Sequence, residues 1–258
     1  MKFELLPSTF DENGKASSRQ HLPCFVVDNC VAFDAGSLAM GCNDLQRANI
    51  RDVVLTHAHL DHVAGLPLFI DDLYSTLVEP VTVHAAPEVI EVLEQHIFNW
   101  SVYPKFSELK NGKGPVMIYK PFAVGTEFSV KHLRIMPLAV NHRVPTAGFI
   151  ISNGSSAVAM SGDTWKMDGF WPDVNKQEAL SALLIECAFP NELEDLAEIS
   201  HHLTPRSLAI EIEKFMKPDC PIHIINIKPA YRDAVIGQLR ALGSDRIKVF
   251  EVGTVYDL

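Results

Sequence analysis

Four side chains that can bind a metal ion lie within one short segment of the sequence. In order they are His57, His59, Asp61 and His62. The apolar run at residues 53–55 precedes them and a helical pattern of apolar residues follows them. We therefore expect these side chains on a loop between a buried strand and a helix, where rigid elements hold a site in place.

The spacing of these four residues suggests how they would bind metal. Residues two apart in an extended segment point to the same side, so the imidazoles of His57 and His59 can converge on one ion. Asp61 and His62 follow where the chain turns into the helix, and their carboxylate and imidazole can hold a second ion. The segment predicts a dinuclear site. A chance cluster is the alternative, and this density of ligands disfavours it.

The segment also carries a family resemblance. Residues 57–62 read H-A-H-L-D-H and resemble the H-x-H-x-D-H signature of the metallo-β-lactamase superfamily of metal-dependent hydrolases. The resemblance implies an α/β fold, a four-layer αββα sandwich with two mixed sheets and helices outside. It covers nearly the whole chain, and no linker divides the sequence, so we expect residues 1–258 to form a single domain with two similar halves.

Further ligands follow from the resemblance. His142 matches the third histidine on the first ion, and Asp163 matches the carboxylate that bridges both ions. Zinc is expected at the first ion, with His57, His59 and His142. Upstream, Asp34 begins a D-A-G segment that resembles the family's D-x-G element, in which the aspartate orients the metal ligands. The alternative for this segment is a simple acidic turn.

The last ligand that the resemblance implies, a histidine on the second ion, is absent. Asn226 occupies its position. His223 lies three residues earlier, an odd separation in a strand, so it should face the opposite side of the sheet. A neutral amide oxygen is a poorer zinc ligand than imidazole and suits harder ions. We expect a weaker second site that holds zinc, manganese or magnesium.

Three segments resemble one branch of the superfamily, the class II 3′,5′-cyclic-nucleotide phosphodiesterases. They are residues 98–104, 202–205 and 227–229. The second segment aligns His202 with the proton donor of related RNA-processing phosphodiesterases, and the resemblance makes Glu186 the carboxylate that steadies it. Catalytic roles are therefore expected for His202, Glu186 and Asp61. The neighbouring His201 is the weaker candidate, expected on an exposed loop.

The branch implies a substrate. A 3′,5′-cyclic nucleotide would be hydrolysed to the 5′-monophosphate by a hydroxide that bridges the two metals. Arg143 and Lys228 are candidates for contacting the phosphate, and solvated surface positions are the alternative for both. Trp100 is the candidate for stacking on the base, and filling of the core is its alternative.

Composition limits the classes of partner. The formal net charge of −10 disfavours a broad nucleic-acid surface, although bound cations would attract a small anionic substrate. The sequence contains no apolar run long enough to span a membrane and no secretory signal at its start, which favours a cytoplasmic protein. The five cysteines are scattered and contain no C-x-x-C pair. A homodimer is the oligomer that we consider.

Other functions fit parts of the same pattern. A tRNA 3′-processing ribonuclease would share the metal ligands, but residues 142–163 leave too little length for the RNA-gripping arm of one such branch. A thioester or lactone hydrolase would use the same ions to polarise a carbonyl. A non-catalytic nucleotide-binding protein would explain the asparagine at position 226, but it has no need for so complete a site.

The elements that must position these residues can also be predicted. Residues 24–27 and 30–33 form a hairpin pattern with a two-residue turn, and residues 148–151 and 157–160 form a second. Helices are expected to begin at Pro87 and Pro205, with Thr204 as the cap of the second. A helix over residues 232–241 and a closing strand over residues 247–252 complete the chain.

Overall fold

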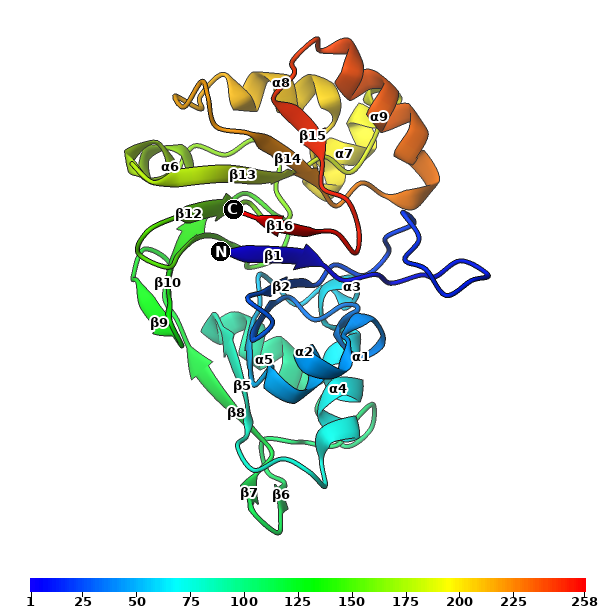
Figure 1. Cartoon of the computed structure of the whole chain (residues 1–258), viewed down its shortest axis with the longest axis vertical. Helices are drawn as coiled ribbons and strands as arrows, with labels where there is room; N and C mark the ends of the chain where they lie inside the picture. Colours follow the sequence, from blue (N-terminus) through cyan, green and yellow to red (C-terminus); the bar gives the residue numbers. More distant parts are fainter. The chain divides into compact units, whose positions relative to one another are not determined.

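The computed structural model describes residues 1–258, which divide into two compact units (Figure 1). The first unit comprises Met1–Ala123 and Val252–Asp257, and the second comprises Val124–Glu251 and Leu258. Each unit contains one seven-stranded sheet. The apolar residues of each unit form a buried core of their own, so each sheet has packed helices to cover it.

The sheet of the first unit has the strand order β16-β1-β2-β3-β4-β5-β8. Its strands are β1 (Lys2–Leu5), β2 (Phe25–Val27), β3 (Val31–Phe33), β4 (Asp52–Val54), β5 (Val81–Ala85), β8 (Met117–Pro121) and β16 (Val255–Asp257). The helices are α1 (Leu38–Gly41), α2 (Asp44–Asn49), α3 (Leu60–Val63), α4 (Gly65–Leu73) and α5 (Pro87–His96). A small separate ribbon pairs β6 (Lys110–Asn111) with β7 (Gly114–Pro115).

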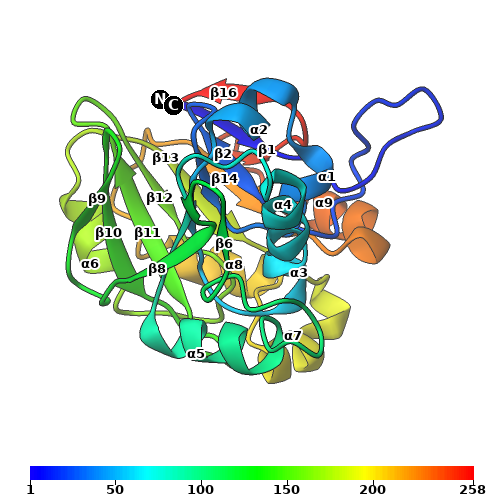
Figure 2. The same cartoon turned by 90° about the horizontal axis from the view of Figure 1, so that it is seen from below.

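The sheet of the second unit has the order β15-β14-β13-β12-β11-β10-β9. Its strands are β9 (Phe128–Val130), β10 (Leu133–Ala139), β11 (Ala147–Ser152), β12 (Ala157–Met160), β13 (Leu180–Glu186), β14 (Ile222–Ile225) and β15 (Ile247–Val249). Its helices are α6 (Trp171–Lys176), α7 (Glu194–Ser200), α8 (Pro205–Ile212) and α9 (Arg232–Ala241), with 3₁₀ turns η1 (Asn191–Leu193) and η2 (Pro229–Tyr231). Figure 2 shows β9, β10 and β11 as neighbouring green strands.

The two sheets share one pairing pattern. Counted from β16, the first sheet has antiparallel pairs up to β3 and parallel pairs from β3 to β8. Counted from β9, the second sheet has antiparallel pairs up to β12 and parallel pairs from β12 to β15. The prediction of two similar halves is therefore confirmed at the level of strand topology.

This topology determines where loops gather within each unit. The carboxyl ends of parallel strands meet at one edge of a sheet, which is where sites form in α/β proteins. In the first unit, that edge carries the loops after β3 and β4. In the second unit, it carries the loops after β12, β13 and β14, and the loop after β10, which runs in the same direction as β12. All predicted metal ligands lie on or directly after these loops.

Most predicted elements are confirmed. Helices begin at Pro87 and Pro205, and the helix over residues 232–241 has the predicted bounds. In α4, the apolar positions that predicted the helix are buried: Leu66, Phe69, Ile70 and Leu73. The amphipathic period thus identified the face of this helix that packs on its sheet.

Two expectations about strands are wrong. The first hairpin has a three-residue connection, because Val27 pairs with Val31, and both Asp28 and Asn29 adopt left-handed backbone conformations within it. The closing strand ends at Val249 instead of residue 252. The chain then turns at Gly253, whose φ is +70°, and β16 pairs antiparallel with β1, which covers an otherwise open sheet edge.

The structure contains no helix that is both long enough and apolar enough to cross a lipid bilayer.

Candidate metal centre

The segment after β4 brings three imidazoles together in the first unit. His57 is fully buried, and its Nε2 lies 3.1 Å from Nδ1 of His59. Two nitrogens bound to one tetrahedral zinc ion, each at about 2.0–2.1 Å from it, are about 3.3 Å apart. The rings of His57 and His62 also lie close, with centroids 4.1 Å apart. This donor set fits a divalent cation.

Asp34, directly after β3, fixes the orientation of these rings. Its Oδ2 accepts a hydrogen bond from His62 Nδ1 at 2.7 Å, and its Oδ1 accepts from the Thr56 backbone N–H at 2.8 Å. The Thr56 hydroxyl lies 2.9 Å from the Asp34 carboxylate and 2.9 Å from His57 Nδ1. If Thr56 donates to Asp34 and accepts from His57, both histidines carry their proton on Nδ1. Their Nε2 lone pairs are then available to a metal.

Asp61 and His62 lie on the single turn α3, where the sequence predicted that the chain becomes helical. His62 is buried, whereas the Asp61 side chain is 29% exposed and can reach solvent-borne ligands. Asp61 Oδ2 lies 4.0 Å from His62 Nε2. A carboxylate and an imidazole nitrogen at this separation can contribute to one cation site.

In the second unit, Asp163, Glu186 and His202 form a buried cluster whose ligand atoms all lie within 4.8 Å of one another. Asp163 follows β12 through Gly162, which has φ +62°. Glu186 ends β13, and His202 precedes the α8 cap at Thr204, whose hydroxyl accepts from the Ser207 N–H. Strand ends and a helix cap therefore hold each of these side chains.

The Glu186 carboxylate binds His202 directly, as the family resemblance implied. Glu186 Oε1 accepts from His202 Nδ1 at 2.7 Å, so Nε2 is the atom that His202 can present to a ligand. Backbone N–H groups of Thr164, Ala188 and Leu203 also donate to the Glu186 carboxylate. Its orientation is therefore determined by four donors at once.

The electrostatics of this dyad favour retention of a proton. Burial raises the pKa of Glu186, while the positive charge and hydrogen bond of His202 oppose that rise. Burial alone would lower the pKa of His202, but the charge and hydrogen bond of Glu186, together with the charge of Asp163, outweigh burial and raise it. Both shifts mean that the pair holds a proton to higher pH than the isolated side chains would.

His142 lies beside this dyad and is oriented by a backbone group. Its Nδ1 donates to the carbonyl oxygen of His201 at 3.1 Å, and its ring centroid is 5.1 Å from that of His202. His201 itself ends α7 in a left-handed conformation and binds Asn141 Oδ1 through its ring at 3.0 Å. It was expected on an exposed loop, but it is half-buried, and its carbonyl group positions a predicted ligand.

The family of the chain can now be identified. A family model described as a beta-lactamase superfamily domain matches residues 30–224, which contain the predicted ligands from His57 to Asp163 and the predicted proton donor His202. The chain belongs to the β-lactamase superfamily. Its predicted superfamily of metal-dependent hydrolases is thereby confirmed, and the histidine and aspartate clusters indicate a divalent metal site.

Solved structures agree on the fold of this superfamily member. Unliganded yeast PDE1 aligns with a TM-score of 0.78 over 100% of this chain and 99% of that chain, at 15% sequence identity. So low an identity shows the shared fold alone. The predicted α/β class and αββα architecture, with two sheets flanked by helices, are confirmed.

Relatives by sequence include proteins named as phosphodiesterases and proteins named as ribonucleases. A Yersinia pestis protein named "Probable 3′,5′-cyclic-nucleotide phosphodiesterase" is 26% identical over 210 residues, which cover 72% of this chain and 59% of that protein. A Triticum aestivum protein named "Nuclear ribonuclease Z" is 27% identical over 149 residues, which cover 54% of this chain and 81% of that protein. The chain therefore spans less than two thirds of the length of the Yersinia protein. The similarity to a ribonuclease means that the expectation of no nucleic-acid partner is not supported.

The remaining predicted ligand of this superfamily member, Asn226, lies directly after β14 and contacts Asp163. Its amide Nδ2 donates to Asp163 Oδ1 at 2.5 Å. His223, which sequence spacing placed on the opposite side of the strand, is buried with its ring 5.5 Å from the ring of Phe250. The structure thus places Asn226 in the cluster with Asp163 and leaves His223 outside it.

The predicted substrate contacts differ in how they are placed. The positive charge of Lys228 is close enough to His202 to oppose part of the rise in the pKa of His202. Arg143 is exposed, and its Nε donates to the Ile199 carbonyl. Trp100 is 57% exposed and has φ +68°, a rare conformation for a bulky residue. Its alternative role of filling the core is excluded by that exposure, whereas Phe98 is fully buried.

Sequence reasoning missed two contributors to the site. The sequence pattern gives Thr56 no role in the site, yet its hydroxyl links Asp34 to His57. Phe189 packs against His202 with ring centroids 5.7 Å apart. The position of Thr56 directly before the first ligand was the only available signal, and a threonine there has no distinctive spacing.

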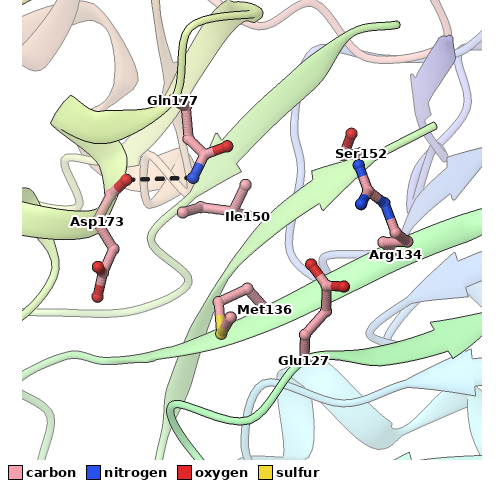
Figure 3. Close-up of a pocket in the computed structure, with 7 residues that line it drawn as sticks. All are labelled: Glu127, Arg134, Met136, Ile150, Ser152, Asp173 and Gln177. Carbon is pink, nitrogen blue, oxygen red and sulfur yellow. Dashed lines mark hydrogen bonds between the residues drawn. The ribbon is translucent and has the colours of Figure 1, made fainter. Parts of the chain in front are cut away.

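A hollow elsewhere in the second unit does not belong to these clusters. Its lining residues are Glu127, Arg134, Met136, Ile150, Ser152, Asp173 and Gln177 (Figure 3). The Gln177 amide donates to the carbonyl oxygen of Asp173 across one end of the hollow. Charges of both signs line it, and it contains no histidine or cysteine, so it lacks the nitrogen and sulfur ligands typical of a zinc site.

We expect Asp34→Asn to weaken metal binding. The Thr56 backbone N–H donates to Oδ1 and His62 Nδ1 donates to Oδ2, but an amide has only one oxygen. One of these two donors therefore loses its acceptor, and the orientation of the metal ligands is disturbed. Loss of such an orienting group typically lowers metal affinity about 10–100-fold. Competition with a fluorescent zinc chelator would measure the change. Asp52→Asn is the matched control, because Asp52 makes a similar bond to His84 at 2.9 Å away from the predicted ligands. Equal affinities in both variants would contradict the role of Asp34.

Proposed function

We propose that this chain is a metal-dependent phosphodiesterase that hydrolyses a 3′,5′-cyclic nucleotide to the 5′-monophosphate. The observation that carries the proposal is the buried His202–Glu186 dyad, whose Nδ1 to Oε1 distance is 2.7 Å, within reach of the Asp163 carboxylate. A histidine held by a carboxylate beside a potential metal ligand is suited to protonating a leaving oxygen. A site that bound nucleotide without turnover would not require this donor.

We propose that residues 1–258 form a single domain whose predicted ligands bind two divalent ions. His57, His59, His142 and Asp163 would hold the first ion, zinc, and Asp61, His62 and Asp163 would contribute to the second, where zinc, manganese or magnesium can bind. When bound, divalent ions make a water acidic enough to attack phosphorus and stabilise negative charge on the phosphoryl oxygens. The close spacing of the donor atoms within each cluster supports this assignment.

The residues of the chain supply the proton for the leaving group. His202 binds Glu186 through Nδ1, so its Nε2–H would face the 3′ oxygen of the substrate. The water oxygen would form a bond to phosphorus and lose one proton to solvent, the bond from phosphorus to the 3′ oxygen would break, and the His202 proton would move to that oxygen. Burial opposes protonation, but the charge and hydrogen bond of Glu186 raise the pKa of His202, and this favours the protonated form that can donate.

Other side chains would hold the substrate in position. Lys228 lies near enough to His202 to affect the pKa of that histidine. The Lys228 ammonium group would bind a phosphate oxygen. Arg143, anchored through Nε, would contact the same anion with its terminal nitrogens. Trp100 would stack on the base, a contact worth about 1–3 kcal/mol per base in single-strand binders.

A second candidate substrate is the 3′ region of a precursor tRNA. The similarity to the wheat nuclear ribonuclease Z favours it, and the net charge of −10 disfavours it, because nucleic-acid binding depends on neutralising phosphates with basic groups. Both substrates are phosphodiesters, so the same dyad would serve either reaction. A cytoplasmic location and a homodimer stay predictions of the sequence alone.

The deciding experiment measures 5′-AMP formed from 3′,5′-cyclic AMP by protein loaded with zinc or with manganese, alongside cleavage of a precursor tRNA. We expect metal-dependent 5′-AMP formation that Asp163→Ala abolishes. Asp173→Ala, a change of the same type on α6, is the matched control and should retain activity. Cleavage of the tRNA without 5′-AMP formation would reject the cyclic nucleotide and favour a ribonuclease. No product from either substrate would reject the phosphodiesterase and favour a thioester or lactone hydrolase or a nucleotide-binding protein.

A further inference from the structure

The side-chain amide of Asn226 makes one hydrogen bond, to Asp163. It is the first residue after β14, it is half-buried, and its backbone has φ +55°. Asparagine and glycine tolerate this left-handed region best. The turn directs the side chain at Asp163, with 2.5 Å between Asn226 Nδ2 and Asp163 Oδ1.

The chemistry of this contact decides which end of the amide faces Asp163. An amide oxygen placed 2.5 Å from a carboxylate oxygen would bring two acceptors together with no hydrogen between them. The amide N–H, in contrast, makes a short charge-assisted hydrogen bond to the carboxylate. Asp163 is only 2% exposed, so its charge depends on protein donors or a cation for stabilisation.

A donor at this position changes what Asp163 can do. We propose that Asn226 is a positioning residue that donates to Asp163 and is not a metal ligand, so that the chain binds one divalent ion tightly. The inference rests on the metal centre of the proposed function. It replaces the expectation that the amide oxygen completes a second metal site. One Asp163 oxygen is engaged by the Asn226 N–H, and the second ion would depend chiefly on Asp61 and His62.

Metal stoichiometry tests this inference independently of catalysis. Protein dialysed against a trace of chelator and titrated with Zn²⁺ would be analysed by native mass spectrometry and calorimetry. We expect one tight equivalent in the natural chain and one in Asn226→Ala, with about 10–100-fold lower affinity in the variant because Asp163 loses its orienting donor. Asn226→His should gain a second equivalent, since histidine also tolerates left-handed backbone and supplies a nitrogen ligand.

The matched control is Asn175→Ala, which removes another amide donor of the same unit, bonded to the Lys214 carbonyl and away from the cluster. It should bind zinc as the natural chain does. Two tight equivalents in the natural chain, with one lost in Asn226→Ala, would overturn the inference. Failure of Asn226→His to gain an ion, or binding of no ion by the natural chain, would do the same. A chain that binds one ion but hydrolyses no phosphodiester would refute the proposed function and leave this inference standing.

Discussion

Replacing His202 with alanine lowers kcat for the cyclic-nucleotide substrate about 10²–10⁴-fold, the usual range for loss of a general acid. The reason is that the 3′ oxygen of a ribose is a poor leaving group unless it is protonated as its bond to phosphorus breaks. His202 is the side chain held for this purpose, with Nδ1 fixed at 2.7 Å from Glu186 Oε1. The KM should change little, because the proton transfer contributes to the transition state.

Three measurements separate this role from a structural one. The metal content of His202→Ala should equal that of the natural chain, because Asp163 and His142 keep their own partners. A substrate with a p-nitrophenolate leaving group needs no proton, so the variant should hydrolyse it with a much smaller loss. His201→Asn is the matched control, since asparagine tolerates the left-handed φ of +57° and preserves the carbonyl that binds His142. An equal loss of rate on both substrates would contradict general-acid catalysis by His202.

The ligands of the first unit could be predicted because they are close in sequence. His57 to His62 lie within one strand-to-helix connection. In such a segment the spacing of two residues determines whether their side chains point to the same side. His142 and Asp163 carry no comparable signal, and only their order in the family pattern identified them. The structure shows why both can belong to one site. Each follows a strand whose carboxyl end lies at the same edge of one sheet.

The orienting contacts could not be predicted from spacing. Thr56 reaches Asp34 across 22 positions of sequence, and Asn226 reaches Asp163 across 63. Such contacts depend on how strands register in the sheet, and register is decided by packing over the whole core. β16 was also missed, because none of its three residues is buried and it therefore shows no apolar run. Its pairing with β1 is a contact between the two ends of the chain, which spacing does not reveal.

The second large effect concerns the backbone beneath the metal loop. We expect Gly36→Ala to lower the free energy of unfolding by about 3 kcal/mol or more, the upper range for overpacking a core. A Cβ at Gly36 would lie 1.9 Å from the Asp61 carbonyl oxygen, 2.7 Å from Leu22 C and 2.8 Å from the Pro23 carbonyl oxygen. All three are backbone atoms, so no side-chain rotation can relieve the overlap.

The overlap would displace the turn that carries Asp61 and His62, so metal binding should weaken together with stability. Urea denaturation of the metal-free protein, followed by circular dichroism, would measure the first effect, and zinc titration the second. Gly112→Ala is the matched control, because nothing lies within 4 Å of its added Cβ. If Gly36→Ala unfolds at the same urea concentration as Gly112→Ala, the close approach of the D-A-G segment to the metal loop is not a constraint on the fold. Equal zinc affinity in the two variants would show that the metal site does not need Gly36 either.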